Sequence, residues 1–253
     1  MIDQVVAIAE NRKINEKYFK LVFRSRNLSR KVKPGQFLNI LIENSFDPFL
    51  RRPFSYYRVT GDRIEILYEI LGKGTAILAR KQKGDNLQVM GPLGKPFTSR
   101  PGKKRVLIGG GIGVPPLLFL AETYGTDYFL IGSKSKLEVL PRKEFGKLQP
   151  KVRYSTNDGS FGVHGYVTRL LEDLLKKEKP EKLFIHTCGP TVMMRAVLKI
   201  ARNKGIDGEV SCEETMACGV GACLGCMVKT PDGWAPSCTE GPVFNFDQLD
   251  WKS

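Results

Sequence analysis

Apolar and polar positions alternate through the first hundred residues with the period of half-buried β-strands. The stretch "YFKLVFR" places three apolar side chains on one face, and "RIEILYEI" places four apolar side chains opposite Glu65 and Glu69. Turn-forming breaks at "KPGQ", "TGDR" and "MGPLG" separate such runs, and one short helical piece, "GTAILARKQK", interrupts them. The pattern predicts an antiparallel β-barrel or sandwich over residues 1–100.

The pattern changes at Pro101 to an alternation of buried strands and helices. "KRVLIGGG", "TDYFLIGS" and "EKLFIHTCGP" are typical of buried strands, whereas "PPLLFLAETYG", "VTRLLEDLLKKEKP" and "TVMMRAVLKIARNKG" have helical periodicity. Pro180 and Gly205 provide stop signals for the last two helices. Residues 101–205 are therefore expected to form an α/β domain, a parallel sheet with helices on both faces.

Periodicity fails over residues 206–253, which hold few large aliphatic side chains. A segment this short cannot build a core alone, so we expect something besides packing to organise it. Four of the chain's six cysteines lie within "CEETMACGVGACLGC", residues 212–226. The prediction for the whole chain is a multidomain α+β protein with a small C-terminal metal-binding module.

Composition limits the classes of function. The chain has 253 residues and 42% hydrophobic content, enough for a globular core. The first residues lack a basic segment followed by an apolar one, and the longest apolar run, Val106–Ala121, is too short and too rich in glycine and proline to span a bilayer. We expect no export signal, no membrane span and a cytoplasmic, reducing compartment, where clustered thiols favour metal or redox chemistry over disulfides.

The charge is uneven along the chain. The net charge is +14, yet from Ser211 onward two basic side chains face six acidic ones. The basic residues of the body are dispersed through strand-like and helix-like segments, with no tract interleaved with aromatics. This distribution favours a solvated surface, a phosphate-bearing cofactor or an acidic partner, and we expect no nucleic acid.

The cysteine spacing is the strongest chemical signal. The pattern C-x4-C-x2-C followed by a fourth cysteine matches the plant-type arrangement for a [2Fe-2S] cluster, with the ligands Cys218, Cys223, Cys226 and Cys238. The intervening glycines let the backbone curl and aim N–H groups at sulfur. Structural zinc is the alternative, but it is usually held by two short cysteine pairs. Cys212 is expected to be a small buried residue and not a fifth ligand.

Three further segments could bind phosphate. "IGGGIGVPP" is a glycine-rich strand end followed by a helix, although "GSKSK" stands where a dinucleotide fold usually has an acid after its second strand. "RRPFSYY" joins an arginine to an extended proline, an aromatic and a hydroxyl, a pattern that an ordinary edge strand with surface arginines also has. "LGKGT" combines glycines, Lys73 and a helix start.

Together these segments resemble the ferredoxin–NADP reductase superfamily, a flavin-binding barrel followed by a nicotinamide-binding α/β domain. "RPFS" is similar to its flavin motif, with Phe54 where tyrosine is usual; the resemblance implies that Arg52 holds the FAD pyrophosphate and that Ser55 lies near the reactive flavin nitrogen. The FAD-binding set that it implies is Arg52, Pro53, Phe54, Ser55, Gly72, Lys73, Gly74 and Thr75. The dinucleotide-binding set that it implies is Gly109, Gly110, Gly111, Gly113, Gly189 and Pro190, and it implies that Cys188 lines the nicotinamide pocket.

The motif "CGVGACLGC" with its trailing "CTEGPVF" resembles the electron-transfer subunits of class 1B dihydroorotate dehydrogenases. That resemblance implies FAD, a [2Fe-2S] cluster and NAD(H), and a partner: an FMN-containing catalytic subunit, with two copies of each subunit. Electrons would pass from the partner's FMN through the cluster and FAD to NAD+. The resemblance implies that this catalytic subunit is a barrel, which needs about 250 residues of its own. This chain is therefore expected to transfer electrons and not to oxidise dihydroorotate itself.

Two alternatives stay open. Flavoprotein subunits of sulfide dehydrogenase and of NADH-dependent ferredoxin–NADP oxidoreductase look similar, but they characteristically carry aspartate at the position of Cys218. A regulatory zinc- or iron-binding module that acts on nucleic acid would show bound zinc without flavin and salt-sensitive DNA binding. The choice between NADH and NADPH is also open. The segment after the second strand has no acidic residue and carries Lys134, which permits the additional phosphate of NADPH, whereas the family implies NADH.

Overall fold

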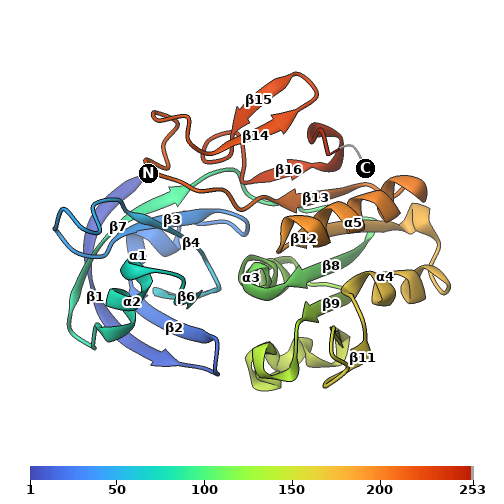
Figure 1. The fold of residues 1–253 in the computed structure, drawn as a ribbon, viewed down its shortest axis with the longest axis horizontal. Helices are drawn as coiled ribbons and strands as arrows, with labels where there is room; N and C mark the ends of the chain where they lie inside the picture. Colours follow the sequence, from blue (N-terminus) through green and yellow to red (C-terminus); the bar gives the residue numbers. More distant parts are fainter. Residues whose placement is uncertain (252–253) are drawn as a thin grey trace.

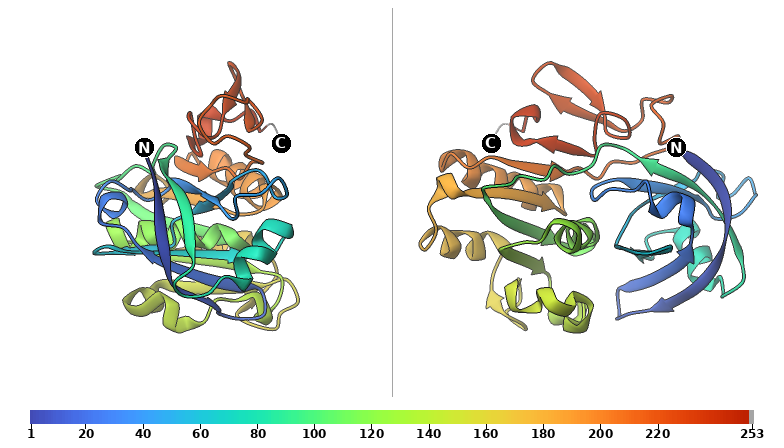
Figure 2. Two further views of the ribbon diagram at one scale, coloured as in Figure 1. Left: turned by 90° about the vertical axis from the view of Figure 1, so that its left-hand side faces the viewer. Right: turned by 180° about the vertical axis from the view of Figure 1, so that it is seen from behind.

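The computed structural model describes residues 1–251 and contains two seven-stranded sheets that lie side by side (Figure 1). The first sheet is antiparallel throughout and has the strand order β4-β3-β7-β1-β2-β6-β5. It curls around a core of its own, as the rear view of Figure 2 shows. Its strands are β1 (Ile2–Lys13), β2 (Tyr18–Arg24), β3 (Phe37–Leu41), β4 (Arg52–Ser55), β5 (Arg58–Thr60), β6 (Arg63–Glu69) and β7 (Asn86–Leu93). Two helices accompany it, α1 (Arg26–Ser29) and α2 (Lys73–Arg80).

The second sheet has the order β11-β10-β9-β8-β12-β13-β16 and is parallel except for β16. Its strands are β8 (Lys104–Gly110), β9 (Tyr128–Ser133), β10 (Val152–Thr156), β11 (Val163–His164), β12 (Leu183–Cys188), β13 (Gly208–Ser211) and β16 (Val243–Asn245). Its helices are α3 (Val114–Tyr124), α4 (Val167–Leu175) and α5 (Thr191–Asn203). The 3₁₀ segments of the chain are η1 (Gly111–Gly113), η2 (Lys136–Glu138), η3 (Arg142–Lys151), η4 (Pro180–Lys182) and η5 (Phe246–Gln248).

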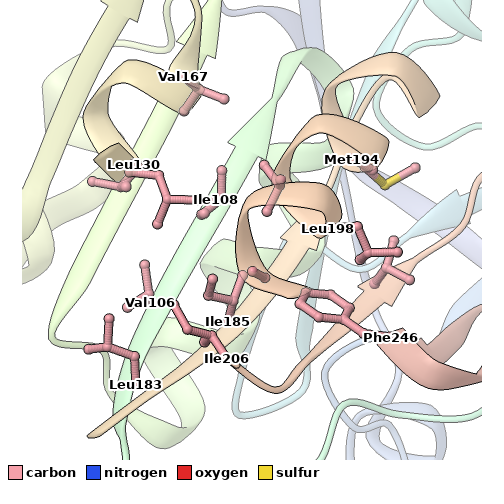
Figure 3. Packing of buried hydrophobic residues seen from close by; sticks show 14 of the residues in the cluster. Val106, Ile108, Leu130, Val167, Leu183, Ile185, Met194, Leu198, Ile206 and Phe246 are labelled. Atoms are coloured by element: carbon pink, nitrogen blue, oxygen red, sulfur yellow. The ribbon is translucent and has the colours of Figure 1, made fainter. Parts of the chain in front are cut away.

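The strands of this sheet are apolar on both faces, because helices cover both. Val106 and Ile108 of β8 pack with α4 and α5, as Figure 3 shows, whereas Leu107 between them packs with α3 on the opposite face. Successive strand residues point to opposite faces, so a continuous apolar run is what two covered faces require. The predicted α/β architecture is confirmed.

The segment after residue 205 is held partly by packing, which the sequence pattern did not indicate. Strand β13 continues the parallel sheet, and β16 pairs with it antiparallel, Ser211 opposite Val243. Phe244, Phe246 and Leu249 join the core beneath α5. Between these strands lie the cysteine loop and a hairpin of β14 (Met227–Thr230) and β15 (Gly233–Pro236). The boundaries at residues 100 and 205 stay predictions.

Glu65 lies differently from what alternation suggests. Its strand β6 presents the apolar face to the barrel core, but the opposite face is covered by the α/β domain, so Glu65 is 6% exposed. It pairs with Lys20 and Arg58 of the neighbouring strands and with Arg63 of its own strand. None of the helices described is long and apolar enough to cross a membrane.

Candidate functional site

A cavity of about 570 Å³ opens between the two sheets. One wall comes from the barrel strands β4 and β6 and from the start of α2, and a second comes from Ile112 and Pro115 at the start of α3. Residues 211–216, which lead from β13 into the cysteine loop, form the third. All eight residues predicted to bind FAD line this cavity: Arg52, Pro53, Phe54, Ser55, Gly72, Lys73, Gly74 and Thr75.

Two cationic side chains and a helix start meet on the barrel wall. A Cβ atom on Gly74 would lie 3.0 Å from Arg52 Nε, so glycine allows the guanidinium to lie directly against the first turn of α2. Thr75 Oγ1 accepts hydrogen bonds from the N–H groups of Leu71 (2.9 Å) and Gly72 (3.2 Å), which fixes that turn. Lys73 pairs with Asp47. Arginine, lysine and free N–H groups at a helix start are the donors that a phosphate needs.

Substituting Arg52 should selectively weaken flavin binding. We expect Arg52→Ala to raise the Kd for FAD by about 10- to 100-fold, because a hydrogen bond to a charged group contributes about 1.5–3 kcal/mol. Fluorescence titration of the flavin-free protein measures this. The adjacent Arg51 is a matched control, because its guanidinium binds Asp3 at 2.8 Å. Equal losses in Arg51→Ala and Arg52→Ala would contradict the assignment.

Phe54 packs where the related motif has tyrosine. It is 9% exposed, and its ring meets Tyr68 edge-on at 6.0 Å between centroids. Tyr68 in turn donates a hydrogen bond to Asn11 Oδ1 (2.9 Å). The two packed aromatic rings therefore line the barrel side of the cavity, and Ser55, which is half-buried, lines it as well.

The glycine-rich turn and the strand end "TCGP" lie in contact. A Cβ on Gly113 would lie 2.3 Å from the carbonyl carbon and oxygen of Cys188, and one on Gly189 would lie 2.8 Å from the Gly110 oxygen. Only glycine permits such a close approach of two backbones. Cys188 is 1% exposed, and burial, followed by the nearby Glu213 carboxylate, raises its thiol pKa.

None of the residues predicted to bind the dinucleotide lines the cavity wall itself. The wall includes Ile112 from within the turn, but it includes neither the glycines of the turn nor Cys188, Gly189 and Pro190. The two halves of the predicted nicotinamide site are in contact beside Ile112. Their individual roles stay predictions.

Glu213 is a cavity residue that the sequence motifs did not indicate. It follows β13 at the start of the cysteine segment and lines the cavity, where its side chain keeps exposed surface although protein atoms surround its carboxyl group. Burial raises the pKa of its carboxyl group, and the carboxylate of Glu69 across the cavity raises it further. Glu69 and Met216 also line the wall. No local pattern marks them, because they reach the site through the fold alone.

The Glu213 carboxyl predicts a pH dependence of stability. The pKa of this carboxyl in the folded, flavin-free protein lies above the usual value of 4.5, so the native state binds a proton more tightly than the unfolded state. The bound proton therefore stabilises the fold at low pH, and this stabilisation is lost as pH rises through the folded-state pKa. Glu213→Gln removes that loss. We therefore expect the Tm of Glu213→Gln minus that of the wild type to increase as pH rises above 4.5. The exposed Glu16→Gln should show no such trend, and a flat difference for Glu213→Gln would contradict the prediction.

Three of the four predicted ligands, Cys218, Cys223 and Cys226, lie in one curled loop, and Cys238 follows strand β15. N–H groups point at three of their sulfurs: Val220 at Cys218 (3.4 Å), Gly221 at Cys238 (3.1 Å) and Cys238 at Cys226 (3.4 Å). Gly219 and Gly221 have positive φ angles of 72° and 84°, which the curl requires. Asn39 of β3 holds the loop on the barrel through the Cys218 oxygen (3.3 Å).

The donor chemistry fits a cationic cluster. The N–H of Val220 lowers the pKa of the Cys218 thiol to about 6, whereas burial raises that of Cys238 to about 11. A buried thiolate is stable only beside a compensating positive charge, which iron would supply. No disulfide links any of the six cysteines. Among residues 1–251, no three His, Cys, Asp or Glu side chains converge closely enough to hold a metal ion, so the ligand set stays a prediction.

Comparison with known proteins decides the family. The model of the "iron-sulfur cluster binding domain of dihydroorotate dehydrogenase B" matches residues 213–250. The chain is 36% identical over 247 residues to the dihydroorotate dehydrogenase B (NAD(+)) electron transfer subunit of Desulforamulus reducens, with 92% of this chain and 93% of that protein covered. The subunit of the same name from Clostridium acetobutylicum is 37% identical, with 97% and 96% covered. The chain belongs to this family.

Solved structures agree with the family's architecture. A structure described under "flavin-based electron bifurcation via the NADH-dependent reduced ferredoxin-NADP oxidoreductase" is similar with a TM-score of 0.87 and 27% identity, covering 98% of this chain and 90% of that chain. Phthalate dioxygenase reductase shares the fold, with a TM-score of 0.62 and 19% identity over 79% and 64% of the two chains. The matched family domain begins at Glu213, so the cavity wall and the cysteine loop belong to one segment of the family.

Proposed function

We propose that the chain is the electron-transfer subunit of a dihydroorotate dehydrogenase that uses NAD+, an oxidoreductase with FAD, an iron–sulfur cluster and NAD(H) as cofactors. The observation that carries this function is the cavity itself. The barrel motif, the start of α3 and the segment entering the cysteine loop form its three walls. A nicotinamide exchanges two electrons as a hydride and an iron–sulfur cluster exchanges one, so FAD supplies the exchange between them.

We assign roles to the residues as follows. Arg52, Lys73 and the first turn of α2 hold the FAD pyrophosphate, and Ser55 hydrogen-bonds the flavin ring. The dinucleotide is received by the glycine turn and the strand end, and Cys188 lines the nicotinamide pocket; the residues of these two segments are Gly109, Gly110, Gly111, Gly113, Gly189 and Pro190. Cys218, Cys223, Cys226 and Cys238 bind a [2Fe-2S] cluster in a small C-terminal module. Support comes from the shared cavity, from the contact between the two glycine-containing turns and from the N–H groups aimed at sulfur.

The partner is a catalytic subunit that oxidises dihydroorotate at FMN, with two copies of each subunit and a cytoplasmic location. The names of the relatives support a dehydrogenase partner. The decisive experiment measures NAD+-dependent oxidation of dihydroorotate by this chain with and without the candidate catalytic subunit encoded nearby. Activity that requires both chains is the expected result. An as-purified and reconstituted protein without flavin and iron–sulfur absorption would contradict the proposal.

A second candidate is the reductase subunit of a ferredoxin-linked complex, favoured by the TM-score of 0.87 to the NADH-dependent ferredoxin–NADP oxidoreductase structure. The cysteine at position 218 argues against it, because it completes a four-thiol set. Co-purification separates the two candidates. A dihydroorotate-oxidising FMN protein bound to this chain supports the first, and a ferredoxin-reducing subunit supports the second.

A further inference from the structure

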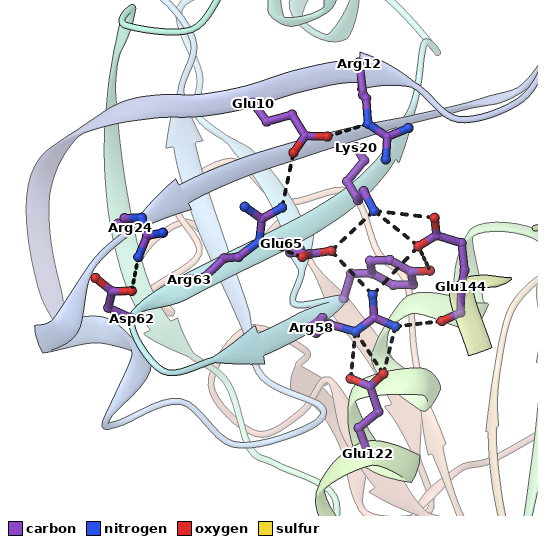
Figure 4. A network of polar contacts seen from close by, with 11 residues as sticks. Glu10, Arg12, Lys20, Arg24, Arg58, Asp62, Arg63, Glu65, Glu122 and Glu144 are labelled. Carbon is purple, nitrogen blue, oxygen red and sulfur yellow. Dashed lines mark hydrogen bonds and ion pairs between the residues drawn. The ribbon is translucent and has the colours of Figure 1, made fainter. Parts of the chain in front are cut away.

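Five charged side chains form a cluster between the barrel and the α/β domain (Figure 4). We call it the interdomain ion cluster: Lys20, Arg58 and Glu65 from the barrel, and Glu122 and Glu144 from the α/β domain. The side chains of Lys20, Glu65 and Glu144 are only 6–8% exposed. Charged residues are seldom buried to this extent unless they are paired.

Every barrel cation of the cluster reaches across to the α/β domain. Arg58 binds the Glu122 carboxylate on α3 at 2.8 Å and the Glu144 backbone oxygen on η3 at 2.6 Å. Lys20 Nζ lies 3.2 Å from the Glu144 carboxylate, which also accepts a hydrogen bond from the Tyr57 hydroxyl at 3.1 Å. Glu65 pairs with both Lys20 and Arg58 at 3.6 Å. The two domains are thus joined by directional bonds as well as by apolar contact.

Buried ion pairs are a poor way to gain stability. Removing charges from water costs several kcal/mol per ion, and well-packed apolar side chains often stabilise an interface as well. What a charged, hydrogen-bonded cluster adds is geometry, because an arginine fork and a carboxylate accept few relative orientations. A sideways shift of one domain would leave buried charges without partners. The cluster is therefore better suited to fixing the relative orientation of the two domains than to holding them together.

The cluster is connected to both walls of the cavity by short, stiff segments. On the α/β side, α3 runs from Pro115 on the cavity wall to Glu122 in the cluster, seven residues or about 10 Å along a helix. On the barrel side, Ser55 on the wall precedes Arg58 by three residues. Phe119, midway along α3, packs into the barrel core. The cluster and both walls of the cavity therefore share the same short segments of chain.

We infer that the interdomain ion cluster positions the α/β domain so that a nicotinamide held at the α3 turn meets a flavin held by the barrel motif. Glu144 is its central positioning residue, since it contacts Lys20, Tyr57 and Arg58 at once. This inference rests on the proposed hydride exchange between NAD(H) and FAD. It assigns to Glu144 an effect on the rate of that exchange, without contact with either cofactor.

The test is rapid mixing of the FAD- and cluster-loaded Glu144→Gln protein with NADH. Glutamine keeps the size of the side chain and removes its charge. We expect the limiting rate of flavin reduction to fall at least about tenfold, since misplacement by about 1 Å can cost 100-fold. The NADH concentration for half-saturation and the FAD content should stay unchanged. The long-wavelength absorption from stacked nicotinamide and flavin should weaken, and Glu144→Asp, which keeps the charge, should recover much of the rate.

Asp62→Asn is the matched control, because it removes an exposed barrel carboxylate that pairs with Arg24 at 2.6 Å and does not bridge the domains. It should reduce flavin at the wild-type rate. If Glu144→Gln lowers Tm but leaves the limiting rate and the stacking absorption unchanged, the cluster serves stability alone and the inference is overturned. A wild-type protein that NADH cannot reduce would overturn the proposed function, and with it this inference.

Discussion

Cys218→Ser is expected to abolish electron transfer past the flavin while sparing NADH-driven reduction of a small dye. A serine oxygen is a poor replacement for the thiolate ligand of a [2Fe-2S] cluster, whereas Cys218 does not line the cavity that holds the predicted FAD-binding residues. We expect dihydroorotate-dependent NAD+ reduction with the partner to fall at least about 100-fold, because the cluster depends on all four thiolates. Dye reduction should stay near the wild-type rate.

Iron content and visible absorption show whether the cluster itself is lost. Cys212→Ala is the control, because Cys212 is 3% exposed in the core beneath α5 and is not a predicted ligand. Its iron content should equal that of the wild type. Wild-type dye reduction together with wild-type partner activity in Cys218→Ser would show that the ligand assignment is wrong.

Gly113→Ala should have the second largest effect, on the nicotinamide half of the reaction. The added methyl group would lie 2.3–2.4 Å from backbone atoms of Cys188 and Gly189, which cannot yield as a side chain could. Either η1 or the end of β12 must move. We expect kcat/KM for NADH-dependent dye reduction to fall about 100-fold, the cost of a 1 Å displacement in a reacting pair. FAD content should be retained.

Gly132→Ala, at the end of β9 in the same sheet, is a matched control. Its added Cβ would meet the Val167 side chain at 2.9 Å, so it tests overpacking without touching the Cys188 turn. We expect a lower Tm and a preserved kcat/KM, measured well below Tm. If both glycine variants lose activity in proportion to their loss of stability, the close approach at Gly113 has no specific role.

Local patterns account for the parts of the site that are contiguous in sequence. Alternation in β6, the glycine turn after β8 and the spacing of the first three ligand cysteines each occupy fewer than about ten residues, and the physical constraint acts within that window. The cavity wall around Arg52 and Gly74 was predicted from the family resemblance, because an ordinary edge strand with surface arginines has the same local pattern. Only the fold shows that glycine is needed to admit the guanidinium.

The unpredicted residues act across long separations. Lys20 and Glu144 meet from positions 124 residues apart, and nothing near either one marks its partner. The sequence pattern indicated that Glu65 lies on the polar face of its strand, but the pattern cannot show that another domain covers that face. Glu213 and the return strand β16 were missed for a related reason: each is placed by the α/β sheet rather than by its own neighbours in the chain.

The pairing of β13 with β16 has a consequence for how electrons leave the protein. Residues 212–242 depart from and return to adjacent strands of one sheet, and Asn39 and Lys95 fasten them to the barrel. The cysteine loop is therefore fixed at both ends, and it does not move between the electron donor and the electron acceptor as a flexibly linked module would. Transfer between flavin and cluster should proceed over one fixed gap, and its rate should be insensitive to solvent viscosity. Only the binding of the partner protein should then depend on diffusion.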